Sequence, residues 1–319
     1  MEKLFLSYIK LFKFNIFGGR KMCGIAGIIN KGGMDVASTL INMLSLIQHR
    51  GPDASGIAVY GMGKEILLRV TEGRKGLHDT LVQIVEKYAS ISREKITESR
   101  NNIFYSEIIL NIKKDYIEKL HQEINEVDGL YVNSCGEGMK VYKDSGLIDN
   151  LLTYQTIDRN TATHGIGHVR MATESAEDVN AAHPFVSPFY SDLSIVHNGQ
   201  FTNYFNLRRK LENKGAKFKT LNDTEAASHL IAYAMSENGG DLEGALHYAS
   251  DQFDGIYCII ASTSDQIGIA KDKLGIKPLL IFEKDGTILL GSEQIEFTSI
   301  FPDVYAEEIE PGEVRVWNL

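Results

Sequence analysis

Cys23 can act as a nucleophile because it directly follows an internal methionine, Met22. If the mature protein begins after Met22, Cys23 carries both a thiol and a free α-amine. An α-amine has an ordinary pKa of about 7.7–8.0 and a thiol one of about 8.5, so at neutral pH the amine can accept the thiol proton. Nucleophile and general base then belong to one residue. The alternative is that Cys23 is a small buried hydrophobic residue that opens a strand.

Four short polar and glycine-rich segments carry the other side chains that could act on a substrate: 49–56, 167–173, 195–199 and 221–225. Arg170 can bind a carboxylate through two parallel hydrogen bonds, and Asp223 can bind an ammonium group. The side-chain amide of Asn198 and the backbone N–H of Gly199 are the kind of donor pair that stabilises an oxyanion. This combination fits an amino-acid substrate with a reactive side chain.

Each of these residues also has a purely structural interpretation. Arg170 could form a surface ion pair, Asn198 and Gly199 could form a turn, and Asp223 could cap a helix. If the site does bind both α-groups of an amino acid, it rejects a simple amide, which would leave Arg170 and Asp223 unpaired in a desolvated pocket. Hydrolysis of the side-chain amide of a free amino acid is therefore favoured over general amide hydrolysis.

Composition and charge exclude several other classes of function. The 319 residues are 43% hydrophobic and 24% charged, as in ordinary soluble globular proteins. A net charge of −9 argues against nucleic-acid binding, and no apolar run is long enough to span a membrane. Cys23, Cys135 and Cys258 are too few and too scattered for a disulfide framework or a metal site. We expect no metal, no cofactor and a cytoplasmic location; Cys258 is expected in the core.

Residues 1–22 differ in texture from the rest of the chain. Bulky apolar residues alternate with lysines, and Lys10 and Lys13 interrupt the apolar centre that a secretory signal needs. An amphipathic membrane-surface helix is the alternative. We expect residues 1–22 to be a leader or a misassigned start that is absent from the active protein, and residues 23–319 to form one domain.

The four segments must be held in place by the strands and helices between them. Along the chain, strands follow strands and helices follow helices, which favours layered sheets covered by helices. The patterns predict strands at 24–30, 138–143, 165–173, 193–197, 256–262, 266–271, 278–283, 287–291 and 313–317, and helices at 34–48, 204–214, 224–236 and 242–253. Hairpins are predicted between 57–60 and 65–70 and around Asp285-Gly286. Residues 74–135 are predicted to be a helical surface insertion, with helices near 81–88 and 106–121.

In this order, the motifs resemble those of the class II glutamine amidotransferases, which are N-terminal-nucleophile hydrolases. The resemblance spans most of residues 23–300 outside the insertion. It rests on Met-Cys-Gly-Ile-Ala-Gly (22–27), His-Arg-Gly-Pro-Asp (49–53), Gly-His-Val-Arg-Met-Ala-Thr (167–173), Ala-His-Pro-Phe (182–185), His-Asn-Gly (197–199), Asn-Asp-Thr-Glu (222–225), Lys-Asp-Lys-Leu-Gly-Ile-Lys-Pro-Leu (271–279) and Gly-Ser-Glu (291–293). In the segment 271–279, lysines stand where the family more often has Arg or Pro.

The resemblance implies an α+β fold, a four-layer αββα sandwich of the N-terminal-nucleophile hydrolase type. It implies that Cys23 attacks the side-chain amide of glutamine and forms a glutamyl thioester. The roles it carries over are an oxyanion hole at Asn198 and Gly199, a glutamine clamp at Arg170 and Asp223, further substrate contacts at Thr173 and His183, and a supporting role near the nucleophile for Arg50. His168 and His197 are expected to support their strands.

Family members usually fuse this domain to one that consumes the ammonia, and the motifs of such domains are missing from this sequence. We therefore expect the acceptor to lie on a partner chain. The insertion and the segment 171–175 are similar to stand-alone amidotransferase subunits of archaeal-type glutamate synthases, whose flavin and iron–sulfur partner aminates 2-oxoglutarate. The alternatives are a catalytically silent subunit that senses glutamine, or a glutaminase domain that serves a different synthase.

Overall fold

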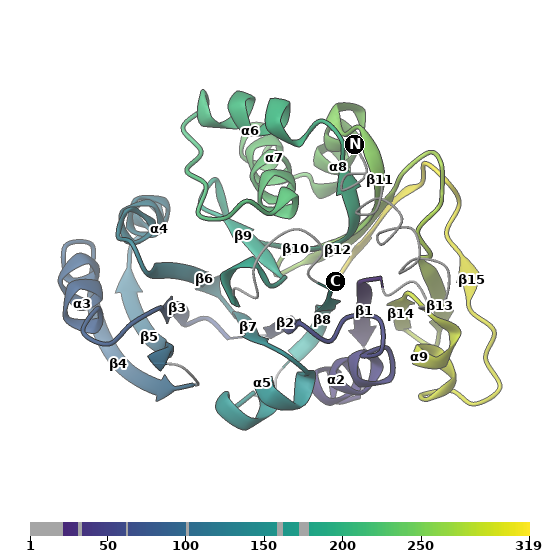
Figure 1. Cartoon of the computed structure of the whole chain (residues 1–319), viewed down its shortest axis with the longest axis horizontal. Helices are drawn as coiled ribbons and strands as arrows, with labels where there is room; N and C mark the ends of the chain where they lie inside the picture. The colour runs from purple at the N-terminus through teal and green to yellow at the C-terminus, as the bar shows by residue number, and fades with distance from the viewer. Residues whose placement is uncertain (1–21, 31–33, 62, 100–101, 158–161, 172–178) are drawn as a thin grey trace, which may run out of the picture.

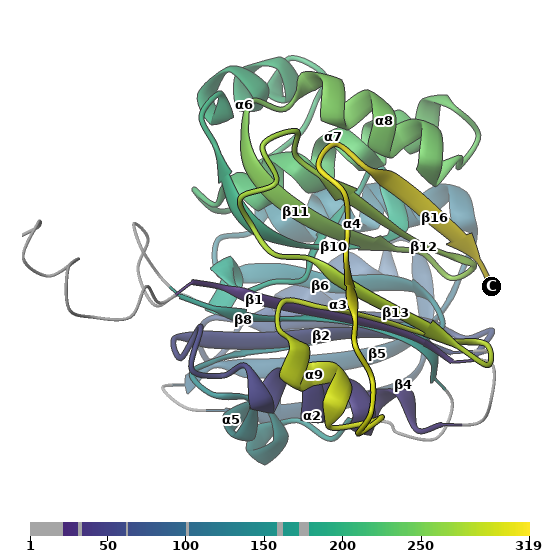
Figure 2. The same ribbon diagram turned by 90° about the vertical axis from the view of Figure 1, so that its right-hand side faces the viewer.

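The computed structural model describes residues 22–30, 34–61, 63–99, 102–157, 162–171 and 179–319. Its main body stacks a layer of helices, two β-sheets and a second layer of helices, which Figure 2 shows edge-on. This is the four-layer α+β arrangement expected from the sequence. A third, smaller sheet lies to one side of the main body (Figure 1). Within the described residues, no helix is long and apolar enough to cross a membrane.

One of the two main sheets has seven strands, and the strand that follows Cys23 lies at its centre. The order is β15 (Glu307–Glu308), β13 (Leu280–Lys284), β14 (Thr287–Gly291), β1 (Gly24–Asn30), β8 (Ala162–Arg170), β2 (Ala54–Gly61) and β7 (Met139–Ser145). Its outer face is covered by α2 (Val36–Leu46), α5 (Ile148–Tyr154) and α9 (Gln294–Thr298).

The other main sheet has five strands and supplies the opposite wall of the site. The order is β16 (Val314–Asn318), β12 (Gln266–Lys271), β11 (Gly255–Ser262), β10 (Tyr190–Phe201) and β9 (Phe185–Ser187). Helices α6 (Tyr204–Glu212), α7 (Asp223–Glu237) and α8 (Leu242–Gln252) cover its outer face (Figure 2). A short 3-10 turn, η3 (Val179–Ala181), precedes β9.

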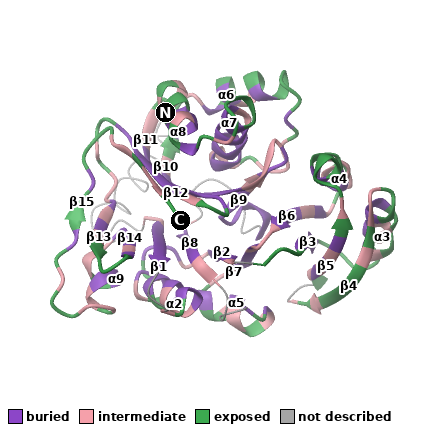
Figure 3. Ribbon diagram, turned by 180° about the vertical axis from the view of Figure 1, so that it is seen from behind, coloured by how far each residue is buried: buried purple, intermediate pink, exposed green. Residues whose placement is uncertain are grey.

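Strand β1 is buried on both faces, because it separates two hydrophobic cores. Side chains alternate along a strand, so Ile25 and Ile29 enter the core between the sheets while Ala26 and Ile28 enter the core beneath α2. All seven residues of β1 are buried, and Figure 3 shows this strand among the most enclosed parts of the fold. The segment behind Cys23 is therefore held rigidly from both sides.

The region predicted as a helical insertion is a small α/β lobe: the helix predicted near 81–88 is present, but the prediction missed the sheet. It pairs strands in the order β4 (Ala89–Glu98), β5 (Phe104–Ile112), β3 (Ile66–Glu72) and β6 (Leu130–Glu137). Two helices, α3 (His78–Glu86) and α4 (Ile117–Glu126, preceded by the 3-10 turn η2, Lys114–Tyr116), pack on it around their own core. The helix predicted near 106–121 is half strand, and Cys135 lies buried in β6.

The two predicted hairpins have opposite outcomes. Strands β13 and β14 do form a two-residue hairpin, with Asp285 and Gly286 at φ values of 51° and 76°. This left-handed pair is the turn that an Asp-Gly sequence favours. Strands β2 and β3 do not pair: β2 lies between β7 and β8 in the main sheet, and β3 lies between β5 and β6 in the lobe. The chain leaves the main sheet at this point.

Candidate active site

Cys23 lies at the end of β1, beside the point where β8 ends. The antiparallel register pairs Gly24 with Val169, which brings Cys23 alongside the last residues of β8. The Cys23 Sγ accepts a hydrogen bond from the backbone N–H of Met171 at 3.4 Å and lies 3.8 Å from the Met171 carbonyl oxygen. By the alternation of β1, Cys23 is on the same face as Ile25, so its side chain is directed between the two sheets.

Two side chains fix the backbone carbonyl of Cys23. The Arg50 Nε and the Asn198 Nδ2 each donate to this oxygen at 3.0 Å. Arg50 is buried, and its Nη1 forms an ion pair with Glu293 Oε1 at 2.6 Å. His49 Nε2 lies 3.1 Å from the same carboxylate oxygen. The structure thus brings Arg50, which follows α2, and Asn198 of β10 to the same carbonyl oxygen of Cys23.

Strand β10 places Asn198 and Gly199 where the five-stranded sheet faces β1. Val196 enters the core between the sheets, so Asn198, two residues later, points to the same side. Gly199 has a φ of 153°, and a Cβ at this position would lie 1.9 Å from the Ile256 carbonyl oxygen on β11. Only glycine fits there, and it leaves the backbone beside Asn198 unobstructed.

Arg170 is the last residue of β8 and is directed into the same space. Ile166 of β8 enters the core between the sheets, and positions 168 and 170 continue that face of the strand. Arg170 is buried, and its charge acts on the thiol of Cys23. Its backbone carbonyl accepts a hydrogen bond from the Asp53 N–H at 3.0 Å, which ties the end of β8 to the 49–56 segment.

Asp223 opens α7, but it is not the residue that caps this helix. The cap is Asn222, whose Oδ1 accepts from the Thr224 N–H at 2.9 Å. Asp223 Oδ2 instead accepts from the backbone N–H of Phe201 at 3.0 Å, and its Oδ1 lies 3.7 Å from His197 Nδ1. A carboxylate in the first turn is also favoured by the helix dipole. Asp223 is thereby held against Phe201 at the end of β10, two residues beyond Gly199.

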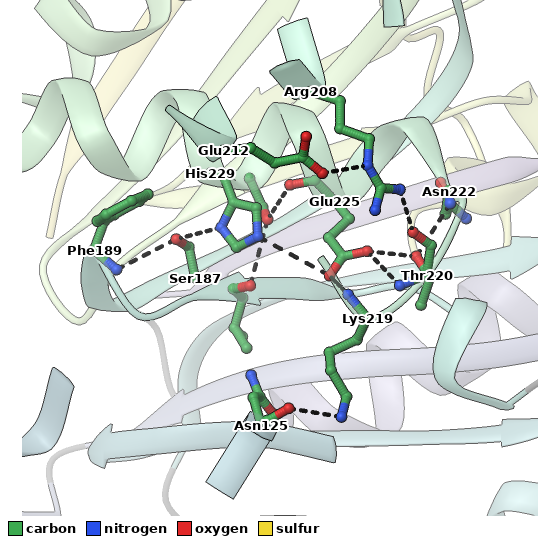
Figure 4. A network of polar contacts seen from close by, with 12 residues as sticks. Asn125, Ser187, Phe189, Arg208, Glu212, Lys219, Thr220, Asn222, Glu225 and His229 are labelled. Carbon is green, nitrogen blue, oxygen red and sulfur yellow. Dashed lines mark hydrogen bonds and ion pairs between the residues drawn. The ribbon is translucent and has the colours of Figure 1, made fainter. Parts of the chain in front are cut away.

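The loop that leads into α7 is anchored by a polar network, drawn in Figure 4. The buried carboxylate of Glu225 accepts from the backbone N–H groups of Lys219 and Thr220 at 2.7 and 2.8 Å. The Lys219 ammonium donates to the carbonyl oxygens of Asn125 and Val127, at the C-terminal end of α4, at 2.7 and 3.0 Å. The lobe is therefore in direct contact with the loop that leads to Asp223. Burial raises the pKa of Glu225.

His183 belongs to a buried group of side chains beneath the site. Its ring stacks on His168 with centroids 3.9 Å apart, and its Nδ1 accepts from the His197 N–H at 3.2 Å. Thr224 Oγ1 lies 3.3 Å from His183 Nε2 and 2.9 Å from His197 Nδ1. Burial lowers the pKa of all three histidines, to about 3 for His168, so they are neutral near pH 7. In this arrangement, His168 and His197 support their strands as expected.

The electrostatics of Cys23 are set by opposing effects. Burial raises the pKa of its thiol above the ordinary value. The Met171 backbone hydrogen bond and the charges of Arg170, Lys277 and Arg50 act in the opposite direction without overcoming burial. A thiol in this state needs a base to give up its proton at neutral pH.

Thr173 lies outside the described residues, so its predicted substrate contact stays a prediction. Three residues of this region were not singled out from the sequence: Lys277 and Glu293, which act near Cys23, and Thr224, which contacts His183 and His197. All three lie inside motifs that the sequence did show, but an ion pair between residues far apart in sequence has no local signal. Within the described residues, no group of three or more His, Cys, Asp or Glu side chains could hold a metal ion.

Comparison with known proteins agrees with this arrangement. The family profile described as "Glutamine amidotransferase domain" matches residues 168–299. A putative glutamine amidotransferase of Methanothermobacter thermautotrophicus is 36% identical over 306 residues, which cover 93% of this chain and 100% of that protein. The glutamine amidotransferase-like protein GlxB of Rhizobium meliloti is 31% identical over 307 residues, covering 93% of this chain and 98% of that protein.

A solved structure confirms the fold. The glutamine phosphoribosylpyrophosphate amidotransferase from B. subtilis superimposes with a TM-score of 0.59 at 22% identity, over 93% of this chain and 47% of that chain. This chain thus spans about half the length of that enzyme. This similarity shows the four-layer fold, which is the architecture that the sequence motifs implied.

Proposed function

This chain belongs to the class II glutamine amidotransferases, enzymes that act on the side-chain amide of glutamine, and we propose that Cys23 is its nucleophile. One observation carries the proposal: side chains from separate elements converge on Cys23. Arg50 and Asn198 bind its carbonyl, the Met171 N–H binds its sulfur, and Arg170 lies at the end of the adjacent strand. No such convergence is needed to bury a cysteine.

The reaction begins when the free α-amine of Cys23 takes the proton from its own thiol. The sulfur bonds to the amide carbon of glutamine, and the carbonyl oxygen becomes negative beside the Asn198 amide and the Gly199 N–H. When the carbon–nitrogen bond breaks, the amine returns the proton to the nitrogen, which leaves as ammonia. Water then adds to the thioester, losing its proton to the amine, and glutamate departs as the thiol is restored.

Glutamine is held at the other end of the site by its α-groups. The Arg170 guanidinium binds the α-carboxylate, and the Asp223 carboxylate, fixed by the Phe201 N–H, binds the α-ammonium. His183 supports β10 through its hydrogen bond with the His197 N–H, and a contact of Thr173 with glutamine is part of the proposal. Clamping both groups selects a free amino acid, because any substrate without them leaves a buried charge unpaired.

The active form begins at Cys23, since the mechanism needs a free α-amine there. Intact mass of the active fraction is expected to correspond to residues 23–319. Cys23→Ala is expected to abolish release of glutamate and ammonia from glutamine. Cys135→Ala, which removes a thiol from the core of the lobe, is the matched control and should retain activity. A fully active protein that keeps residues before Cys23 would contradict the proposal and favour the silent glutamine sensor.

We further propose that the ammonia is consumed by a partner chain of the glutamate synthase type, which aminates 2-oxoglutarate. Support comes from two relatives that the alignment covers over 100% and 98% of their length, so the domain also occurs without an attached acceptor domain. The test is co-purification from the native source. A partner that makes glutamate from 2-oxoglutarate with free ammonia alone, and with glutamine only when this chain is added, is the expected result. A partner with a different acceptor would overturn this assignment.

A further inference from the structure

Lys277, in the segment between β12 and β13, brings an ammonium group to the nucleophile. Its Nζ lies 3.6 Å from Met22 Sδ, the thioether of the residue that precedes Cys23. A thioether is a weak acceptor, and no carboxylate of the described residues pairs with this ammonium. The backbone of Lys277 is fixed by its carbonyl, which accepts from the Cys258 thiol at 3.2 Å.

The charges that act on the Cys23 thiol are those of Arg50 after α2, Arg170 at the end of β8 and Lys277. Lys277 also acts on two other titratable groups. One is His197 in β10, which Asp223 faces as well, and the other is the Cys258 thiol in β11, beside Lys271, Asp272 and Glu308. The charges of Arg50, Arg170 and Lys277 are not equally available to the nucleophile. Arg50 is paired with a carboxylate at 2.6 Å. Arg170 is assigned to the substrate carboxylate, and Asp223 to the substrate ammonium. His197 is neutral near pH 7, because burial lowers its pKa.

Lys277 is thus the cation whose charge remains uncompensated when glutamine is bound. We propose that Lys277 sets the protonation of Cys23, holding the α-amine of the processed enzyme in its neutral, proton-accepting form and stabilising the thiolate. The inference rests on the proposed function, because the α-amine exists only once Met22 is gone. Loss of Met22 also removes the thioether on which the Lys277 ammonium lies.

The physical reason is that a neighbouring cation disfavours a second positive charge and favours a negative one. It therefore lowers the pKa of the α-amine and that of the thiol together. An α-amine with an ordinary pKa of about 7.7–8.0 is mostly protonated at pH 7 and is then a poor base. The thiol starts from a pKa that burial has already raised. The Lys277 ammonium shifts both pKa values in the direction that the reaction needs, although burial still keeps the pKa of the thiol above its ordinary value.

The test uses the processed enzyme, verified by mass, with Lys277→Met, Lys277→Arg and the exposed neighbour Lys273→Met as matched control. The first readout is the pH dependence of kcat/KM for glutamine. Lys277→Met is expected to displace the acidic limb upward by about one pH unit and to lower kcat/KM at pH 7 roughly tenfold, while Lys277→Arg and Lys273→Met follow the wild type.

The second readout is the pH dependence of Cys23 alkylation by iodoacetamide, followed by peptide mass. Cys135 and Cys258 are buried and do not compete. Alkylation does not depend on glutamine turnover, so this profile distinguishes failure of the proposed function from failure of the role of Lys277. A processed wild type that hydrolyses no glutamine overturns the proposed function. The role of Lys277 is overturned if the pH profiles of the wild type and Lys277→Met coincide in both readouts. It is also overturned if Lys277→Arg loses as much activity as Lys277→Met and neither variant shifts its pH profile.

Discussion

At the scale of single residues, the site depends on hydrogen-bond donors that point at one carbonyl and one sulfur. Asn198 is the central example, because its amide binds the Cys23 carbonyl at 3.0 Å and lies next to the N–H of Gly199. The hydrogen bond to the Cys23 carbonyl and the proposed stabilisation of the oxyanion both require an N–H donor. A carboxylate of the same size offers only acceptors at neutral pH and brings a negative charge to the place where negative charge develops.

Asn198→Asp is therefore expected to lower kcat by about 10²–10³-fold, the typical cost of one lost oxyanion donor, with a much smaller change in KM. Steady-state kinetics with glutamine, measured on protein whose melting temperature is close to that of the wild type, provides the check. Asn206→Asp, an exposed site on α6, carries the same chemical change and should be silent. A kcat for Asn198→Asp within a few fold of the wild type would exclude Asn198 from the oxyanion site.

At the scale of elements, the start of α7 is held by the lobe as well as by its own cap. Lys219 joins the loop before α7 to the end of α4 through two carbonyl oxygens, at 2.7 and 3.0 Å. Glu225 on α7 binds the backbone of the same loop. Asp223 lies between these two anchors. The lobe therefore helps to hold the loop that leads to Asp223, the residue proposed to bind the ammonium group of glutamine.

Lys219→Met is expected to raise KM for glutamine by roughly three- to tenfold with little change in kcat. The less ordered loop costs about 1 kcal/mol of binding free energy at Asp223, and the surroundings of Cys23 stay unchanged. Lys217→Met is the matched control: its ion pair with Glu126 is more than half exposed on both sides and contributes little. The split between KM and kcat is the measurement that matters. An equal fall in kcat for both variants, with KM unchanged, would contradict the role of the loop.

The elements also show where sequence patterns fail. Local periodicity identified β1, α2, α7 and the Asp285-Gly286 hairpin, because each depends on residues close in the chain. The hairpin predicted between β2 and β3 was wrong because pairing partners are chosen by the whole sheet. The same holds for the lobe: residues 106–112 form a central strand only because β3 and β4 flank them. Strand partners are long-range information.

At the scale of the whole molecule, two sheets face each other and bring Cys23 and Asn198 together from positions 175 residues apart. Residue types at the strand ends predicted which side chains gather. The charge arrangement around them was not predictable, because Lys277 and Glu293 reach the site through tertiary packing alone. The same packing buries many titratable groups, which links the stability of the entire fold to pH.

Burial lowers the pKa of six histidines and raises that of three carboxyl groups. The histidines are His121, His164, His168, His183, His197 and His229, and the carboxyl groups belong to Asp192, Glu225 and Glu296. Between pH 6.5 and 5, the unfolded chain protonates its histidines while the folded protein keeps them neutral, so acid favours unfolding. The carboxyl groups act in the opposite direction, since the folded protein holds protons that the unfolded chain releases. Because six histidines take up protons on unfolding and only three carboxyl groups release them, unfolding at acidic pH is accompanied by a net uptake of protons.

The free energy of unfolding is therefore expected to fall as the pH is lowered from 7 to 5, by about 1.4 kcal/mol per pH unit for each net proton taken up. Urea unfolding at several pH values measures this slope. His121 is buried on α4 with a pKa of about 3, so His121→Leu should flatten the slope by up to one proton. The exposed His247→Leu is the matched control. A wild-type stability that is level or rises toward pH 5 would mean that the buried carboxyl groups, and not the histidines, dominate the proton balance of the fold.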